Sequence, residues 1–229
     1  GTGGMGMNHV IANKEGESIR TVAVCDVDAD HLADGLKKAG KGCTGYSDFR
    51  RVLERKDIDA IHVPTPPHWH ALISIAAMQA GKDVLCEKPL TRFIAEGRAV
   101  VEAEKRYRRI CQVGTFGRYS EIRRPESVLI HKIVASGLLK NCEGVHLKRG
   151  GLKVKQWSGL VNATPEAVPS WLDWDMYCGP APLRPYHHHR FGGTHRGYWD
   201  YEGGGLADMG QHHFDPVQWK YAKDDTSPV

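Results

Sequence analysis

Three short stretches of the chain place chemically active side chains beside turn-forming residues. The first is GTGGMG at residues 1–6, in which Gly1, Gly3 and Gly6 have the G-x-G-x-x-G spacing. Between a strand and a helix, such glycines allow a tight turn and the close approach of a pyrophosphate. A chain with 26 glycines can match this spacing by chance, so the interpretation needs support from nearby residues.

Asp26 supplies that support. It lies 20 residues after Gly6, near the end of the apolar run RTVAVCDVD at 20–28. An acidic side chain there accepts hydrogen bonds from the adenosine ribose hydroxyls and repels a 2′-phosphate. The glycine loop and Asp26 together predict that the chain binds NAD, with NADP less favoured. The strand that should stand before Gly1 is missing, and we therefore expect the chain to be a fragment.

The second stretch is VLCEKPL at 84–90, where Glu87, Lys88 and Pro89 follow an apolar strand. Ligands of open α/β sheets bind beyond the carboxyl ends of strands, and a following proline keeps Lys88 extended. A lysine beside a nicotinamide can hydrogen-bond a substrate hydroxyl and help to remove its proton. The alternative is an exposed lysine in a connecting loop.

The third stretch is GGGLADMGQHHFD at 203–215. On an α-helix Asp208 and His212 are four residues apart and share a face. An imidazole beside a carboxylate is a suitable general base near neutral pH. The alternative is a surface pair without function, and we expect the neighbouring His213 to face either the protein interior or a substrate.

Strand and helix patterns alternate through the first half of the chain. Apolar runs predict strands at 20–28, 58–66, 82–89 and 110–116, and helical spacing predicts helices at 29–40, 68–81 and 91–109. Gly40 is a candidate C-cap, and Thr91 a candidate N-cap. The alternation, without hairpin signals, predicts a parallel sheet covered on both faces.

The pattern changes after about residue 118. A helix is expected at 126–137 and a strand at 143–150, followed by a stretch at 155–205 that is rich in Trp, Pro, Gly and His. Helical spacing returns at 203–222. We therefore expect two domains, 1–117 and 118–229, of which the second ends before its sheet is complete.

Composition bounds the partners and the compartment. The net charge is +4, and the basic clusters are interleaved with acids, so no nucleic-acid partner is expected. No apolar run approaches the ~20 residues of a membrane span. The six cysteines stand far apart without a CxxC pair, which suits a reducing compartment. We expect a cytoplasmic protein, and a periplasmic one stays open because a targeting peptide cannot be judged.

The run HHHRF invites a metal interpretation through His187, His188 and His189. Consecutive loop residues do not easily ligate one ion together, and no thiol or carboxylate spacing supports a site. We therefore expect no metal. Histidine, tyrosine and tryptophan side chains in this region also suit a sugar or polyol pocket, which needs apolar ring faces and polar edges.

Five motifs together resemble one family of enzymes. GTGGMG, VAVCDVD, TPPHWH, CEKPL and GGGLADMGQHHFD occur in the order found in the Gfo/Idh/MocA oxidoreductases, which include glucose-fructose oxidoreductase and inositol dehydrogenase. The resemblance implies an α/β protein: a Rossmann-type parallel-sheet domain, then an α/β domain with an open, mostly antiparallel sheet. It also implies hydride transfer between a sugar or polyol and a nicotinamide cofactor, and a homo-oligomer for the full-length protein.

The resemblance assigns roles residue by residue. It implies that Lys88, Asp208 and His212 are catalytic. The expected cofactor-binding residues are Gly1, Thr2, Gly3, Gly4, Met5, Gly6, Asp26, Thr65, His68, Glu87, Lys88 and Gln112. The expected substrate-binding residues are Lys88, Arg118, Tyr198, His212 and His213.

Two other functions stay open at this point. Some relatives keep NAD bound and cleave glycosidic bonds by transient oxidation of a sugar carbon, and the same lysine and histidine would serve them. A non-catalytic NAD-binding module is the other alternative. Lys88, Asp208 and His212 argue against it, because nucleotide binding alone does not require them.

Overall fold

The computed structural model describes residues 1–12, 19–115, 117–118, 124–147 and 157–225. Its strands are β1 (Ala23–Cys25), β2 (Thr44–Tyr46), β3 (Ala60–Val63), β4 (Asp83–Glu87) and β5 (Cys111–Gly114). Its α-helices are α1 (Gly4–Ala12), α2 (Ala29–Ala39), α3 (Phe49–Leu53), α4 (His70–Gln79), α5 (Ile94–Tyr107), α7 (Pro125–Ala135), α8 (Trp174–Cys178) and α9 (Gln211–Lys220). Short 3₁₀ segments include η1 (Pro67–Trp69), η3 (His188–Arg190) and η4 (Gly192–Gly197), and a π-helical turn, η5 (Leu206–Gly210), precedes α9.

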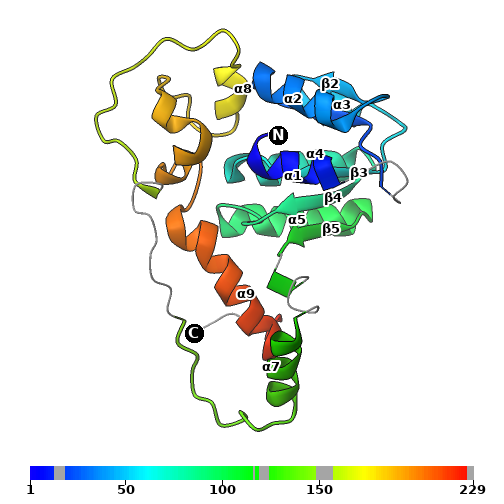
Figure 1. Ribbon diagram of the computed structural model, residues 1–229, viewed down its shortest axis with the longest axis vertical. Helices are drawn as coiled ribbons and strands as arrows, with labels where there is room; N and C mark the ends of the chain where they lie inside the picture. Colours follow the sequence, from blue (N-terminus) through cyan, green and yellow to red (C-terminus); the bar gives the residue numbers. More distant parts are fainter. Residues whose placement is uncertain (13–18, 116, 119–123, 148–156, 226–229) are drawn as a thin grey trace.

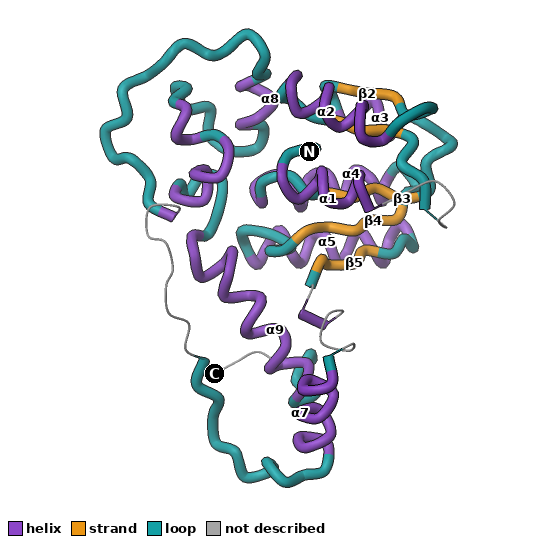
Figure 2. Tube along the Cα trace, viewed as in Figure 1, coloured by secondary structure: helices purple, strands orange, loops and turns teal. Residues whose placement is uncertain are grey.

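The described strands form two parallel sheets (Figure 1). One contains β1 and β2, and the other has the order β3-β4-β5. Helix α1 lies between the two sheets, while α4 and α5 cover the three-stranded sheet (Figure 2). The parallel arrangement predicted from the strand–helix alternation is confirmed. Strand β2 and helix α3 were not predicted, because segments of three and five residues are too short to show a periodicity.

Alternation along β4 sends successive side chains to opposite faces. Val84 and Cys86 are buried in the core that β3 and β4 form with α4 and α5. The parallel register pairs His62 with Leu85, which places His62 on the same face as Glu87. The polar face of this sheet is therefore the one opposite α4 and α5.

Helix ends follow the predicted capping chemistry in one case and not in another. Asp28 caps α2 by accepting the N–H groups of Asp30 and His31, and Gly40 ends that helix at φ 80°, as predicted. Thr91 does not cap α5. The helix begins at Ile94, and the carboxylate of Glu96 accepts the N–H groups that precede it. The Thr91 hydroxyl donates to the carbonyl of Phe93 instead of accepting an N–H of the first turn.

The second half of the described chain is mostly loops and short helices (Figure 2). Of the strand predicted at 143–150, residues 143–147 form a loop, and 148–150 lie outside the described residues. The described residues after Gly114 contain no strand of a sheet, so the expected antiparallel sheet is not seen there. A strand needs a partner for its backbone, and here the extended pairing is limited to a single bridge between Asp28 and Leu172.

An aromatic core holds residues 171–201 against the first half of the chain. It contains Trp174, Tyr177 and Tyr201. The imidazole of His68 and the indole N–H of Trp69 both contact the carbonyl oxygen of Tyr177, at 2.9 and 3.0 Å. A side chain at Gly179, whose φ is +47°, would place its Cβ 1.9 Å from the Trp69 ring. Glycine is required at this contact by both the backbone and the ring.

Helix α9 runs from this aromatic region to α7 (Figure 1). The rings of His131 on α7 and Trp219 on α9 lie 5.0 Å apart. In the part of the chain that the structure describes, no helix has both the length and the apolar character to cross a bilayer. All six cysteines are free, and burial raises the pKa of the Cys86 thiol to about 12.

Stability should fall on mild acidification because two histidines are buried as neutral rings. Burial lowers the pKa of His68 and of His195 to about 4, against roughly 6.5 in an unfolded chain. Between these values the unfolded state binds more protons, so the free energy of unfolding decreases as pH falls from 6.5 towards 4. Glu202, whose pKa burial raises to about 7, acts in the opposite direction.

A single replacement isolates the histidine contribution. Urea unfolding of the wild type and of His68→Gln at pH 7.5 and 5.0 should show a smaller acid-induced loss in the variant, by about 2 kcal/mol. His146→Gln, on an exposed loop, should behave like the wild type. Equal losses in the wild type and His68→Gln would show that His68 is not held neutral.

Candidate active site

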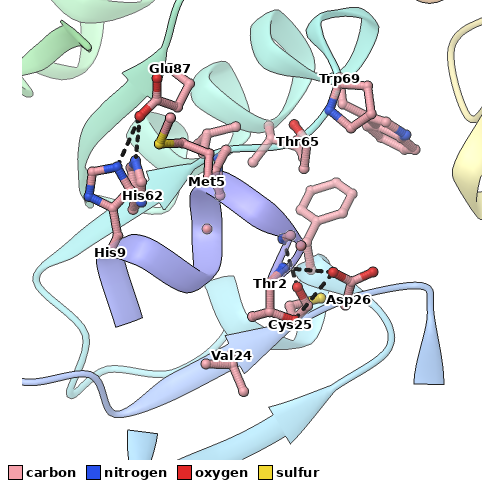
Figure 3. A pocket seen from close by; sticks show the side chains of 18 of the residues that line it. Thr2, Met5, His9, Val24, Cys25, Asp26, His62, Thr65, Trp69 and Glu87 are labelled. Carbon is pink, nitrogen blue, oxygen red and sulfur yellow. Dashed lines mark hydrogen bonds and ion pairs between the residues drawn. The ribbon is translucent and has the colours of Figure 1, made fainter. Parts of the chain in front are cut away.

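One cavity of about 920 Å³ connects the glycine loop to the second half of the chain. Its walls come from the two sheets, from the loop after β3 and from the segment around η4 and η5. Figure 3 shows the part of the cavity around the glycine loop, with Asp26, Thr65 and Glu87. The predicted site residues that line it are Gly1, Thr2, Gly3, Gly4, Met5, Gly6, Asp26, Thr65, Glu87, Lys88 and Asp208. Residues as far apart in sequence as Gly1 and Asp208 therefore line one cavity.

The glycine loop turns directly into the first helical turn of α1. The first intrahelical bond runs from the N–H of Met7 to the carbonyl of Gly3, at 2.7 Å. The preceding N–H groups have no partner within the helix, and such helix N-termini bind phosphates. A Cβ on Gly6 would lie 1.9 Å from the carbonyl oxygen of Gly1, whereas one on Gly4 would meet nothing within 4 Å. The tight turn therefore depends on Gly6.

Asp26 lies beside this loop at the end of β1. Its carboxylate accepts the N–H of Thr2 at 2.6 Å and that of Asp28 at 3.0 Å. These bonds fix the carboxylate against the glycine loop. A carboxylate has about four acceptor positions, so it can still accept ribose hydroxyls.

Thr65, His68 and Gln112 have different surroundings, although the resemblance groups them together. The hydroxyl of Thr65 lines the cavity, is buried and has no hydrogen-bond partner among the described residues. His68 lies in the contact with Tyr177, and Gln112 lies on β5 opposite Leu85. Neither is among the residues that line the cavity. An unsatisfied buried hydroxyl marks Thr65 as a place where a ligand atom would fit.

Lys88 and Asp208 meet at the far end of the cavity. The Lys88 Nζ donates to the carboxylate Oδ1 of Asp208 at 2.5 Å and to its main-chain carbonyl at 2.8 Å. The other carboxylate oxygen accepts Arg196 Nε at 2.9 Å and the indole N–H of Trp157 at 3.1 Å. Burial favours a raised pKa for Asp208, but the Lys88 bond and the two cations outweigh it and lower the pKa. The carboxylate is therefore ionised between two positive charges.

The charges of Lys88 and Asp208 both act on the imidazole of His212. Burial lowers its pKa, the charge of Lys88 lowers it further, and the charge of Asp208 raises it. The spacing argument assumed an α-helix, but Asp208 lies in the π-helical turn η5, where side chains are offset differently along the helix. The cationic partners of Asp208 were not predicted.

Of the five predicted substrate-binding residues, Lys88 alone is among those that line the cavity. Arg118 forms ion pairs with Asp215 at 2.6 Å and Asp224 at 2.8 Å. Tyr198 is only 7% exposed, and its hydroxyl accepts the N–H of Leu160. His213 lies on α9 beside His212. None of these three residues, nor the predicted catalytic residue His212, is among the cavity-lining residues.

Sequence reasoning missed several polar groups around Asp208. Arg196 and Glu202 both line the cavity, and Glu202 is only 2% exposed. Both lie in HRGYWDYEGGG, a segment that was expected to form a pocket but has no periodic pattern to assign single residues. Trp157 lies even farther from Asp208 in sequence. No spacing signal could have identified these contacts.

Glu87 faces a cluster of its own on the polar side of the sheet. Its carboxylate contacts His9 on α1 at 3.0 Å and approaches His62 on β3 at 3.6 Å (Figure 3). Burial would raise the pKa of Glu87, but the two imidazoles outweigh it and lower the pKa to about 2. The adjacent residues Glu87 and Lys88 thus have entirely different partners.

Two family models match the chain. One, described as an oxidoreductase family with an NAD-binding Rossmann fold, matches residues 1–115. The other, the C-terminal alpha/beta domain of an oxidoreductase family, matches residues 125–229.

Known relatives match mainly the first half of the chain. Inositol 2-dehydrogenase of Salmonella paratyphi B is 33% identical over 124 residues, which are 53% of this chain and 37% of that protein. Levoglucosan dehydrogenase of Pseudarthrobacter phenanthrenivorans is 34% identical over 137 residues, or 60% of this chain and 32% of that protein. A solved levoglucosan dehydrogenase in complex with NADH and L-sorbose has a TM-score of 0.50 at 28% identity, covering 60% of this chain and 38% of that one. The chain spans about a third of the length of these relatives.

The glycine loop offers a matched pair of variants. Gly6→Ala should weaken NAD binding by on the order of tenfold or more, because its Cβ forces the loop open against the Gly1 carbonyl. Gly4→Ala, which meets nothing within 4 Å, should change the Kd by less than about threefold. Isothermal titration with NAD measures both. Equal affinities would contradict the assigned function of the loop.

Proposed function

We propose a function for this chain from one premise: it belongs to the Gfo/Idh/MocA oxidoreductase family, whose NAD-binding Rossmann fold matches residues 1–115. The proposal is that it transfers a hydride between NAD and a sugar, polyol or related carbohydrate. Relatives named as inositol and levoglucosan dehydrogenases support this substrate class. A homo-oligomer for the full-length protein stays a prediction.

A single observation carries the proposal. Lys88 and Asp208 form a buried ion pair in the same cavity as the glycine loop and Asp26. The chain thus places an ordered cation within the space that a nucleotide at the loop would share. A module that only bound nucleotide would have no need of this arrangement.

The described residues fit NAD. The first turn of α1 would hold the pyrophosphate, Asp26 the adenosine ribose, and the unsatisfied hydroxyl of Thr65 another polar group of the cofactor. The carboxylate of Asp26 would repel the 2′-phosphate of NADP, which favours NAD. When bound, the nicotinamide supplies the hydride acceptor or donor.

The side chains would handle the substrate oxygen and its proton. Two of the three N–H bonds of Lys88 are directed at Asp208, and the third would donate to the reacting hydroxyl. His212 would accept the hydroxyl proton while the carbinol carbon loses its hydrogen with the bonding electron pair. The products are a carbonyl compound and an imidazolium, and the reverse reaction returns both hydrogens.

Replacing Lys88 tests the proposal most directly. Lys88→Ala should lower turnover of a polyol substrate by roughly 10²–10⁴-fold, while NAD still binds, because the substrate hydroxyl loses its donor. Lys105→Ala, on the exposed side of α5, is the control and should keep full activity. NADH absorbance reports turnover, and calorimetry reports nucleotide binding.

The turnover measurements distinguish the proposed dehydrogenase from the alternative functions. Unchanged turnover in Lys88→Ala would refute the catalytic assignment of this residue. Turnover of glycosides by the wild type, without net NADH and with nucleotide retained after purification, would replace the dehydrogenase with a redox-neutral glycoside-cleaving enzyme.

The pH dependence of oxidation should report His212. As a base it must be neutral, and burial and Lys88 hold its pKa below 6.5. The rate kcat/KM should therefore stay high down to pH 6.5 and decline only at lower pH. In His212→Gln the residual rate should lack this decline, whereas His146→Gln should keep it. A wild-type midpoint above pH 6.5 would argue against His212 as the base.

A further inference from the structure

We propose that His9, His62 and Glu87 form a binding site for one divalent transition-metal ion of the zinc class. The three residues come from α1, β3 and β4, and their ligand atoms all lie within 4.8 Å of one another. Figure 3 shows both imidazoles directed at the Glu87 carboxylate. The inference does not depend on the hydride-transfer proposal.

The distances suit a shared ion. Two ligand atoms about 2.1 Å from one tetrahedral ion lie roughly 3.4 Å apart. The Nε2 atoms of His9 and His62 lie 3.0 and 3.6 Å from the same oxygen of Glu87, on either side of this value. The two imidazole rings contact each other, with centroids 3.8 Å apart, and would move apart to bind one ion together.

His62 shows the clearest sign that the cluster is incomplete without a ligand. Its Nε2 is buried and has no hydrogen-bond partner among the described residues. The 3.6 Å separation from Glu87 is too long for a hydrogen bond. Buried polar atoms are normally satisfied, and an ion would occupy this nitrogen.

The ligand chemistry selects the class of ion. Two imidazoles and one carboxylate suit zinc, cobalt or ferrous iron, whereas magnesium and calcium prefer oxygen ligands alone. One negative charge from the buried Glu87 offsets half of the charge of a divalent ion. A water molecule would complete a tetrahedral set.

A second histidine–glutamate trio provides a natural comparison. Glu166, His187 and His188 also bring ligand atoms within 4.8 Å, but Glu166 and His188 are exposed. The Glu166 carboxylate already accepts both the backbone N–H and the Nδ1 of His188, at 2.9 and 2.8 Å. His188 thus already binds the Glu166 carboxylate, and two of the three residues are exposed, so variants of this trio serve as controls.

The ion would have a structural effect. It would join α1, which follows the glycine loop, to the residue that precedes Lys88. Ligands at positions 9, 62 and 87 have no short spacing, so no sequence motif indicates them. Only the fold brings them together.

Cobalt and zinc titrations of the full 229-residue chain test the proposal. Co²⁺ should bind one to one with the visible bands of a tetrahedral site, and without the near-ultraviolet charge-transfer band that a cysteine ligand would add. Zn²⁺ at a concentration about a hundredfold above its Kd should raise Tm by roughly 5–10 °C. Both effects should disappear in His62→Val and persist in His188→Ala.

Each result decides the question. No cobalt bands in the wild type, or bands of equal strength in His62→Val, would overturn the site. Glu87→Gln keeps the shape of the side chain but removes its charge, and it answers the same question if His62→Val fails to fold by circular dichroism. A cysteine charge-transfer band in the wild type would place the ion elsewhere and also overturn the proposal.

Discussion

The ion pair between Lys88 and Asp208 is the interaction on which the proposed site depends, because it joins residues 120 positions apart in sequence. Removing two charges from water is costly, and the pair is stable here because Arg196 and Trp157 also bind the carboxylate. The bonds to the Asp208 carboxylate offset this desolvation free energy only when the two halves of the chain are docked. The Lys88–Asp208 pair therefore forms only in the assembled fold.

Docking is secured close to the same cavity. The loop after β3 contributes Thr65 to the cavity wall, and three residues later its side chains bind the backbone of α8. On the other side, the N–H of Ala29 donates to Trp171, and that of Asp173 donates to Val27. These bonds thus attach the second half of the chain to the segments that follow the carboxyl ends of β1 and β3.

The sequence predicted what local patterns determine. The parallel strands, the C-cap at Gly40 and the glycine loop beside Asp26 follow from periodicity and residue type. The partners of Asp208 could not be predicted, since Arg196 lies in an aperiodic segment and a π-helical turn changes the side-chain offset. Strand β2 was missed because three residues show no alternation.

The contact between Trp69 and Gly179 restricts how this fold can diverge. One face of the loop that carries Trp69 borders the cavity, and its indole fills the space that a side chain at 179 would need. Whether a replacement at position 69 or 179 is tolerated therefore depends on the residue at the other position. A smaller ring at position 69 would leave a void beside Gly179. We therefore expect positions 69 and 179 to change together in related sequences, because each determines the space that is left for the other.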